Sequence, residues 1–117
     1  DSKTEAYERA LGFLARAAMH GRPPFEGPLS ITIEALMPIP ASWSAKKRAS
    51  AEAGEIYPEG SPDWDNLGKI ACDALNQIVY GDDRQIVHGS VTKRYSAAPS
   101  LRIEVRRWLA EESKSGL

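Results

Sequence analysis

Cysteine and histidine are scarce in this chain of 117 residues, which has one cysteine, Cys72, and two histidines, His20 and His88. A single thiol excludes an intrachain disulfide, and no second thiol is present to build a zinc site. The two histidines are too few and too isolated for a histidine-rich metal site. The lack of disulfides fits a reducing compartment, so we expect a cytoplasmic protein.

Long hydrophobic runs are also missing. No apolar stretch approaches the roughly 18 residues that cross a bilayer, and the polar N-terminus is unlike a signal peptide. We therefore expect no membrane partner. Hydrophobic residues make up 42% of the chain and charged residues 26%, which is typical of a globular protein. The length predicts a single domain over residues 1–117.

The chain has almost no net charge, since its formal charge is -1. At first sight this balance argues against a nucleic-acid partner, but the charges are sorted along the chain. Residues 51–83 hold eight acidic residues and one basic residue, whereas residues 84–107 hold six basic residues and one acidic residue. The acidic block is either a solvated face or a group of carboxylates that a cation holds together.

Hydrophobic periodicity predicts six elements. They are helices at 4–19, 45–53 and 63–77 and strands at 29–35, 85–95 and 101–106. The order indicates an α+β fold, a small mostly antiparallel or mixed sheet with helices packed on one face. A hairpin is the simplest pairing of the last two strands.

Two aspartates, Asp63 and Asp65, flank the start of the third helix, and Asp83 follows eighteen residues after Asp65. Helix capping explains one aspartate at such a place but leaves the second unexplained. A calcium loop is excluded, because its fifth and twelfth positions would be Leu67 and Ala74. The alternative is a site in which three carboxylates hold a hard cation, Mg²⁺ or Mn²⁺.

Lys69 lies one helical turn beyond Asp65, on the same face. An ammonium beside a metal–carboxylate site suits phosphoryl transfer, because it stabilises charge that develops on phosphate. A surface ion pair between Asp65 and Lys69 is the simpler alternative.

The segments PDWDNLGKIACDALN (62–76) and VYGDDRQI (79–86) closely resemble the RusA family, the Holliday junction resolvases of bacteria and their prophages. PASWSAKKR (40–48), Tyr7-Glu8 and KRY (93–95) are similar to the prophage branch. The resemblance covers essentially the whole chain. Members usually begin with a strand and a basic loop before the first helix, and we expect this chain to lack them.

The resemblance implies a homodimeric, Mg²⁺-dependent endonuclease, encoded by a bacterium or phage, that nicks two opposed strands of a four-way DNA junction in recombination and repair. It implies metal binding by Asp63, Asp65 and Asp83 and a catalytic role for Lys69. Asn66, Asp73 and Asp82 match positions that we expect to support the site. Asp82 is the closest competitor of Asp83 as the third ligand.

A protein that binds DNA must neutralise phosphates. The predicted phosphate contacts are Lys46, Lys47, Arg48, Lys93, Arg94, Arg102, Arg106 and Arg107. Trp43 and Trp64 are candidates for stacking on an exposed base, although packing in the core or a loop is the commoner role of a tryptophan.

Two other functions remain open at this point. The chain could be a non-catalytic module that binds branched DNA, or a less selective nuclease that acts on flaps and forks. The sequence alone does not separate these functions from junction resolution.

Overall fold

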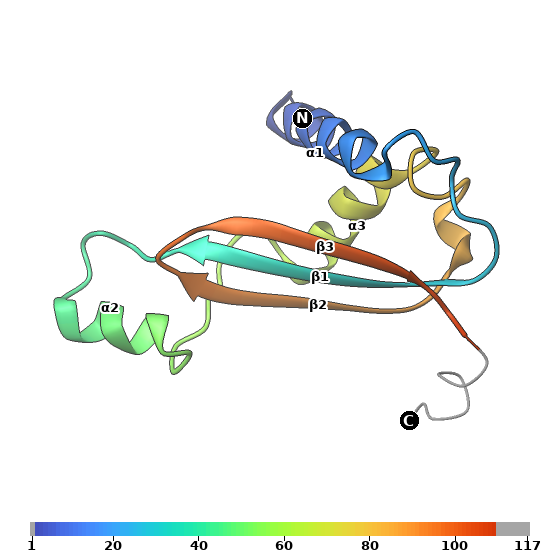
Figure 1. Cartoon of the computed structure of the whole chain (residues 1–117). Coiled ribbons are helices and arrows are strands. Elements are labelled where there is room, and N and C mark those ends of the chain that lie inside the picture. The colour runs from blue at the N-terminus through green and yellow to red at the C-terminus, as the bar shows by residue number, and fades with distance from the viewer. Residues whose placement is uncertain (1, 110–117) are drawn as a thin grey trace.

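The computed structural model describes residues 2–109 and shows a three-stranded sheet with two helices on one of its faces (Figure 1). The elements are α1 (Ser2–Met19), β1 (Leu29–Pro38), α2 (Ala45–Glu52), α3 (Trp64–Leu75), the short 3₁₀ helix η1 (Asp83–Gln85), β2 (Ile86–Ser96) and β3 (Ser100–Arg107). Helix α1 packs on α3, and α3 packs on β1 and β2. None of the helices within residues 2–109 has the length and apolar character needed to cross a membrane.

The sheet has the order β2-β1-β3. Strand β1 pairs in parallel with β2, where Ile33 lies opposite Val91, and antiparallel with β3, where Ile33 lies opposite Ile103. The α+β class and the mixed sheet are therefore confirmed. The hairpin of the last two strands is wrong, because β1 lies between them.

The reason for this order lies in the burial of the strands. Leu29, Ile31, Ile33 and Ala35 of β1 are each at most 5% exposed, whereas the apolar residues of β3 are only partly buried. The central position in the sheet therefore belongs to β1, the strand whose apolar side chains are fully buried. The three residues between β2 and β3 then cross the end of β1, a span of about 10 Å that four extended Cα steps can reach.

The core lies between the sheet and the pair α1 and α3. Its largest fully buried side chain is Tyr80, whose hydroxyl donates to the Cys72 carbonyl at 2.9 Å and so joins the end of α3 to the chain that follows. Gly89 brings β2 close to β1, since a Cβ at this position would lie 2.9 Å from Ile31 Cγ2. Both contacts fix α3 and β2 relative to β1.

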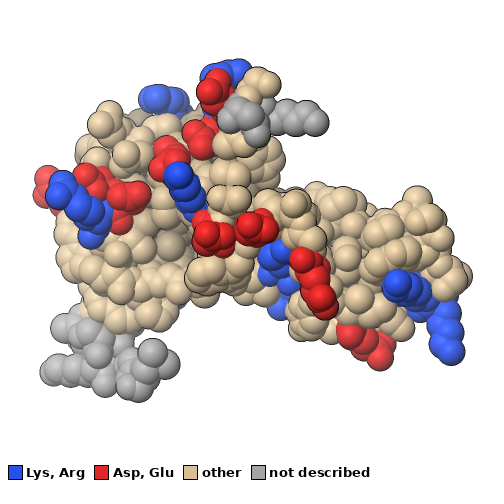
Figure 2. Space-filling view, turned by 180° about the vertical axis from the view of Figure 1, so that it is seen from behind, with Lys and Arg blue, Asp and Glu red and all other residues tan. Residues whose placement is uncertain are grey.

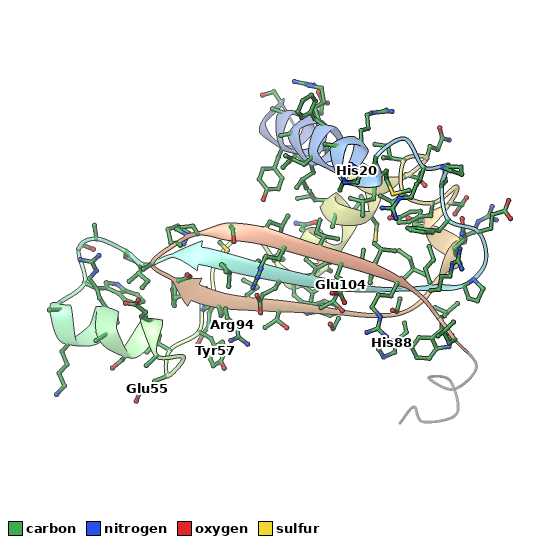
Figure 3. All side chains as sticks on the ribbon, viewed as in Figure 1. His20, Glu55, Tyr57, His88, Arg94 and Glu104 are labelled. Atoms are coloured by element: carbon green, nitrogen blue, oxygen red, sulfur yellow. The ribbon has the colours of Figure 1, made fainter. Side chains whose placement is uncertain are left out.

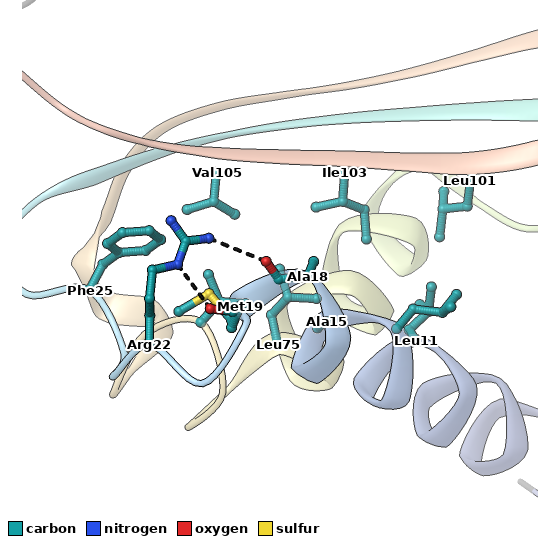
Figure 4. Close-up of a pocket in the computed structure, with 12 residues that line it drawn as sticks. Leu11, Ala15, Ala18, Met19, Arg22, Phe25, Leu75, Leu101, Ile103 and Val105 are labelled. Carbon is teal, nitrogen blue, oxygen red and sulfur yellow. Dashed lines mark hydrogen bonds between the residues drawn. The ribbon is translucent and has the colours of Figure 1, made fainter.

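An apolar cavity of about 430 Å³ lies between α1 and β3 (Figure 4). Leu101, Ile103 and Val105 face it from β3. At one end, Arg22 caps the C-terminus of α1, donating from Nε to the Met19 carbonyl at 2.9 Å and from Nη2 to the Ala18 carbonyl at 3.2 Å.

The other face of the sheet is open and polar. His88, Arg94 and Glu104 project from it, away from α1 and α3 (Figure 3). Helix α2 does not cover this face, because it lies beyond the end of the sheet at which β1 and β2 finish (Figure 1). The molecule therefore has a body and an arm that α2 forms.

Candidate active site at the start of helix α3

The first of the two aspartates, Asp63, occupies the N-cap position of α3 in extended backbone geometry. Its side chain makes no capping hydrogen bond. The next carboxylate, Asp65, accepts only a local bond, from the Asn66 amide at 3.1 Å to Oδ1. Helix capping therefore does not account for the Asp63 carboxylate, and both aspartates are exposed to a ligand.

The start of α3 is held against the sheet by Trp64, which lies between these aspartates. The indole Nε1 donates to the Val91 carbonyl of β2 at 2.8 Å. A second bond runs from Lys93 Nζ to the Gly60 carbonyl at 2.6 Å and fixes the loop that enters the helix. The position of the carboxylates thus depends on β2.

A cleft of about 510 Å³ between α1 and α3 contains Lys69 together with Asp63, Asn66 and Asp73. Glu5 and Glu8 of α1 also line it. None of the ion pairs formed within residues 2–109 includes Lys69. The surface pair with Asp65 is therefore not formed, and the ammonium is available to a ligand. Acidic and basic side chains are interspersed on the face seen in Figure 2.

The two aspartates before β2 differ in their contacts. Asp82 caps η1: its Oδ1 accepts from the Arg84 amide at 2.8 Å, and its Oδ2 lies 3.1 Å from Arg84 Nη2. The bond from the Arg84 amide lowers the pKa of Asp82, and the Arg84 side chain lowers it further. The Asp82 carboxylate is therefore already used by its own turn.

Asp83 is exposed and lies near the second half of α3. Burial raises the pKa of the Cys72 thiol, and the nearby negative charges of Asp83 and Asp73 raise it further. Residues 65 and 72 are about 10 Å apart along a helix axis. Asp83 is thus close to Cys72, in the second half of the helix that carries Asp65 near its start.

The structure brings some of the predicted site residues together in one cleft and leaves others outside it. Asp63, Asn66, Lys69 and Asp73 share one cleft, whereas Asp65 and Asp83 do not line it. Within residues 2–109 no three His, Cys, Asp or Glu side chains are close enough together to hold a metal ion. The available donors are nonetheless carboxylates, the ligands that Mg²⁺ prefers.

The basic residues of the arm are mostly exposed. Lys46 and Arg48 project from α2, and basic side chains lie at the tip of the molecule that α2 forms (Figure 2). Lys47 Nζ lies 4.0 Å from the centroid of the Trp43 ring, which also contacts Tyr95 edge-on at 5.3 Å. The packing interpretation is therefore confirmed for Trp43.

The basic residues of the strands divide between the two faces of the sheet. Arg94 and Arg102 both lie on the open face and share Glu34, at 3.7 Å and 3.4 Å. Arg106 follows Arg102 on the same face of β3. Lys93, by contrast, is bonded to Gly60 and serves the loop before α3.

Two contacts were not expected from the sequence. His88 stacks on Trp108, with ring centroids 4.8 Å apart. The Gln85 amide oxygen accepts from the Gly81 and Asp82 amides, and its nitrogen donates to the Phe25 and Gly27 carbonyls. The spacing of Asp82 and Gln85 is that of a capping box, and this pattern could have predicted the bond from the Asp82 amide to Gln85 but not the other three.

An α+β fold with unpaired carboxylates beside a free ammonium, and basic residues on the neighbouring elements, is typical of enzymes that process nucleic acid. Comparison with known proteins agrees with this class. The family model described as "Endodeoxyribonuclease RusA" matches residues 1–106, so the chain belongs to the RusA family of endodeoxyribonucleases.

A curated relative comes from Bacillus subtilis (strain 168), where it is named "Uncharacterized protein YqaN". The two sequences are 38% identical over 98 residues, which cover 80% of this chain and 69% of the relative. No solved structure matches the chain. The family assignment that the motifs predicted is thus confirmed by a match over nearly the whole chain.

Proposed function

We propose that this chain is a divalent-metal-dependent endonuclease that resolves four-way DNA junctions by paired nicks, in recombination and repair. The proposal depends on two side chains that line one cleft of a RusA-family chain. One is the Asp63 carboxylate, which makes no capping bond, and the other is the Lys69 ammonium. Within residues 2–109 the Asp63 side chain makes no capping bond and Lys69 forms no ion pair, so both groups can bind a ligand.

Asp63, Asp65 and Asp83 are the proposed metal ligands, and Mg²⁺ or Mn²⁺ is the proposed ion. The ion, when bound, polarises the phosphodiester and makes a water more acidic. Asp83 is preferred to Asp82 because the Asp82 carboxylate is already bonded to Arg84. The contribution of Asp83 requires its turn and the start of α3 to come closer than they are in this structure.

Lys69 is the proposed catalytic cation. Its ammonium, held in the cleft beside Asp63, would stabilise negative charge that develops on the phosphate oxygens. Trp64 and Lys93 hold the helix start and its loop on β2, and this rigidity keeps the carboxylates oriented. Asn66 and Asp73 line the same cleft and would support the arrangement.

DNA would be bound by the arm, and the open face of the sheet, which lies on the opposite side from the cleft between α1 and α3, carries further basic side chains. Lys46 and Arg48 are exposed on α2 and can neutralise phosphates directly. Arg94 and Arg102 must first give up part of their contact with Glu34. Two opposed nicks require two sites, which a homodimer with two-fold symmetry supplies.

The proposal is tested by incubating an end-labelled four-way junction with the protein in Mg²⁺ and in EDTA. Symmetrical nicks that form only with the metal support it, and sedimentation of the protein–junction complex gives the number of subunits. A junction that is shifted but uncut in both lanes would identify a non-catalytic binder. Equal cleavage of flap and fork substrates would identify a broader nuclease.

A further inference from the structure

The three tryptophans have different surroundings. Trp43 contacts Tyr95 and Lys47, and Trp108 stacks on His88. Trp64 is 60% exposed, and no aromatic ring or cation packs on its indole within residues 2–109. Trp64 is therefore the tryptophan whose ring is open to a ligand, although exposure of a single hydrophobic residue is common and does not by itself indicate one.

The Trp64 ring is exposed but not free to rotate. Its one polar atom, Nε1, is bonded to the Val91 carbonyl at 2.8 Å, so the orientation of the ring is set by β2. The hydrogen-bonding capacity of the indole is therefore already used. What the side chain still offers to a ligand is the face of its π system.

The residues on either side of Trp64 limit the kind of ligand. Asp63 and Asp65 precede and follow it, and consecutive Cα atoms are about 3.8 Å apart. Aspartate is depleted at the centres of protein–protein contacts, which disfavours a protein partner for this ring. A nucleotide fits better, because its phosphate can reach the carboxylates through a metal ion while its base meets the indole.

We propose that Trp64 stacks on the nucleobase next to the phosphodiester that is cut. This inference rests on the proposed function, which brings the phosphodiester to Asp63 and Asp65. When the arms of a junction are unstacked, the bases at the branch point lose a stacking neighbour on one side, so a flat face is available there. Stacking on an aromatic side chain tolerates any base, and Trp64 therefore favours branched over continuous DNA without reading sequence.

The test compares Trp64→Phe with Trp64→Leu. Both variants lose the bond to the Val91 carbonyl, and only the first keeps an aromatic face. The probe is a four-way junction with 2-aminopurine at the branch point, in Ca²⁺ so that the strands stay uncut. Phe13→Leu is the matched control, because it removes a ring that is 73% exposed at a distance in sequence from the aspartates. Circular dichroism verifies that each variant is folded.

We expect the wild type and the Phe variant to quench 2-aminopurine, and the Leu variant to bind the junction about tenfold more weakly without quenching. The Phe13→Leu control should behave as the wild type. Equal affinity and equal quenching in the Phe and Leu variants would overturn the proposal, and an equal loss in both would reduce Trp64 to an anchor of α3. Failure of the proposed function itself is read separately, from whether the wild type nicks this junction in Mg²⁺.

Discussion

Two segments of this chain each carry a pair of aspartates, and they use them in opposite ways. At residues 81–85 the Asp82 carboxylate accepts a backbone hydrogen bond, pairs with Arg84 and belongs to a capping box with Gln85. At residues 62–66 the Asp63 carboxylate makes no capping bond, and Asp65 accepts only from its own neighbour. An aspartate carboxylate thus stabilises the turn at 81–85 by hydrogen bonds and an ion pair, whereas the Asp63 carboxylate makes no such contribution to the start of α3.

The difference teaches where stability and activity reside. Carboxylates with hydrogen-bond partners contribute to folding, whereas unpaired carboxylates near one another repel and contribute only when a cation is bound. Substitutions in the two segments should therefore have separable effects. Those at Asp63, Asp65 and Lys69 should affect cleavage, and those at Asp82 and Gln85 should affect unfolding.

The largest effect is expected from Asp65→Asn. This change removes a proposed metal ligand and no contact that the fold needs, so single-turnover cleavage of a labelled junction should fall on the order of a thousandfold. Junction affinity in a gel shift and the melting temperature should stay near the wild-type values. Cleavage at the wild-type rate would show that Asp65 holds no metal.

Lys69→Ala should lower kcat by about a hundredfold, by loss of an electrostatic stabiliser of the transition state. Because Lys69 forms no ion pair with any other residue of 2–109, its removal should leave thermal stability unchanged. Lys69→Arg, which keeps the charge, is the control and should retain part of the activity. A decrease of only twofold in Lys69→Ala would make this residue an ordinary surface charge.

The choice between Asp82 and Asp83 can be made without an activity assay. Asp83→Asn should weaken Mn²⁺ binding by about tenfold in a calorimetric titration, because it removes a proposed ligand. Asp82→Asn, the same chemical change one residue earlier, should leave the affinity near that of the wild type. The opposite result would exchange the two assignments.

Gln85→Ala should act on the fold alone. It removes four hydrogen bonds: two that the Gln85 oxygen accepts from amides within the turn at 81–85, and two that its nitrogen donates to the Phe25 and Gly27 carbonyls. We expect the free energy of unfolding in urea to fall by about 2 kcal/mol. Gln85→Glu, which keeps the acceptor but not the donors, should lose about half as much. Equal losses in the two variants would place the stabilisation in the donor contacts to the Phe25 and Gly27 carbonyls.

The smallest effect concerns the pH dependence of stability. The pKa of Asp82 is lowered in the folded state, so its stabilising contribution is present above the unfolded pKa of about 4 and is lost as the pH falls through the lower folded value. The melting temperature of Asp82→Asn should therefore lie slightly below that of the wild type at pH 7. The gap should close in acid, and a gap that persists at pH 2 would exclude this cause.

The helices and strands could be predicted from the sequence because each leaves its own period in the chain. The alternation at 29–35 indicates a strand with one buried face, and β1 does extend over Leu29–Pro38. Alternation does not say which strands are neighbours, and so the hairpin was wrong. The order depends on how completely each apolar row is buried, which only the packed structure shows.

The site was predictable to a similar extent. The sequence predicted that Asp63 and Asp65 flank a helix start and that Lys69 lies one turn further along the same helix, and the structure places them there. The anchoring of Trp64 on Val91 could not be predicted, because it joins a side chain to a backbone carbonyl 27 residues away. Neither residue type nor spacing encodes a contact of that kind.

The bond between Trp64 and Val91 also affects how the sheet can associate. β2 is an outer strand, and an outer strand exposes backbone groups that invite pairing with another chain. The indole occupies one of these groups at the middle of β2, and a bulky ring stands beside it. A strand from another chain would have to displace the Trp64 ring in order to pair along this part of β2. The residue that anchors α3 therefore also hinders edge-to-edge pairing of the sheet.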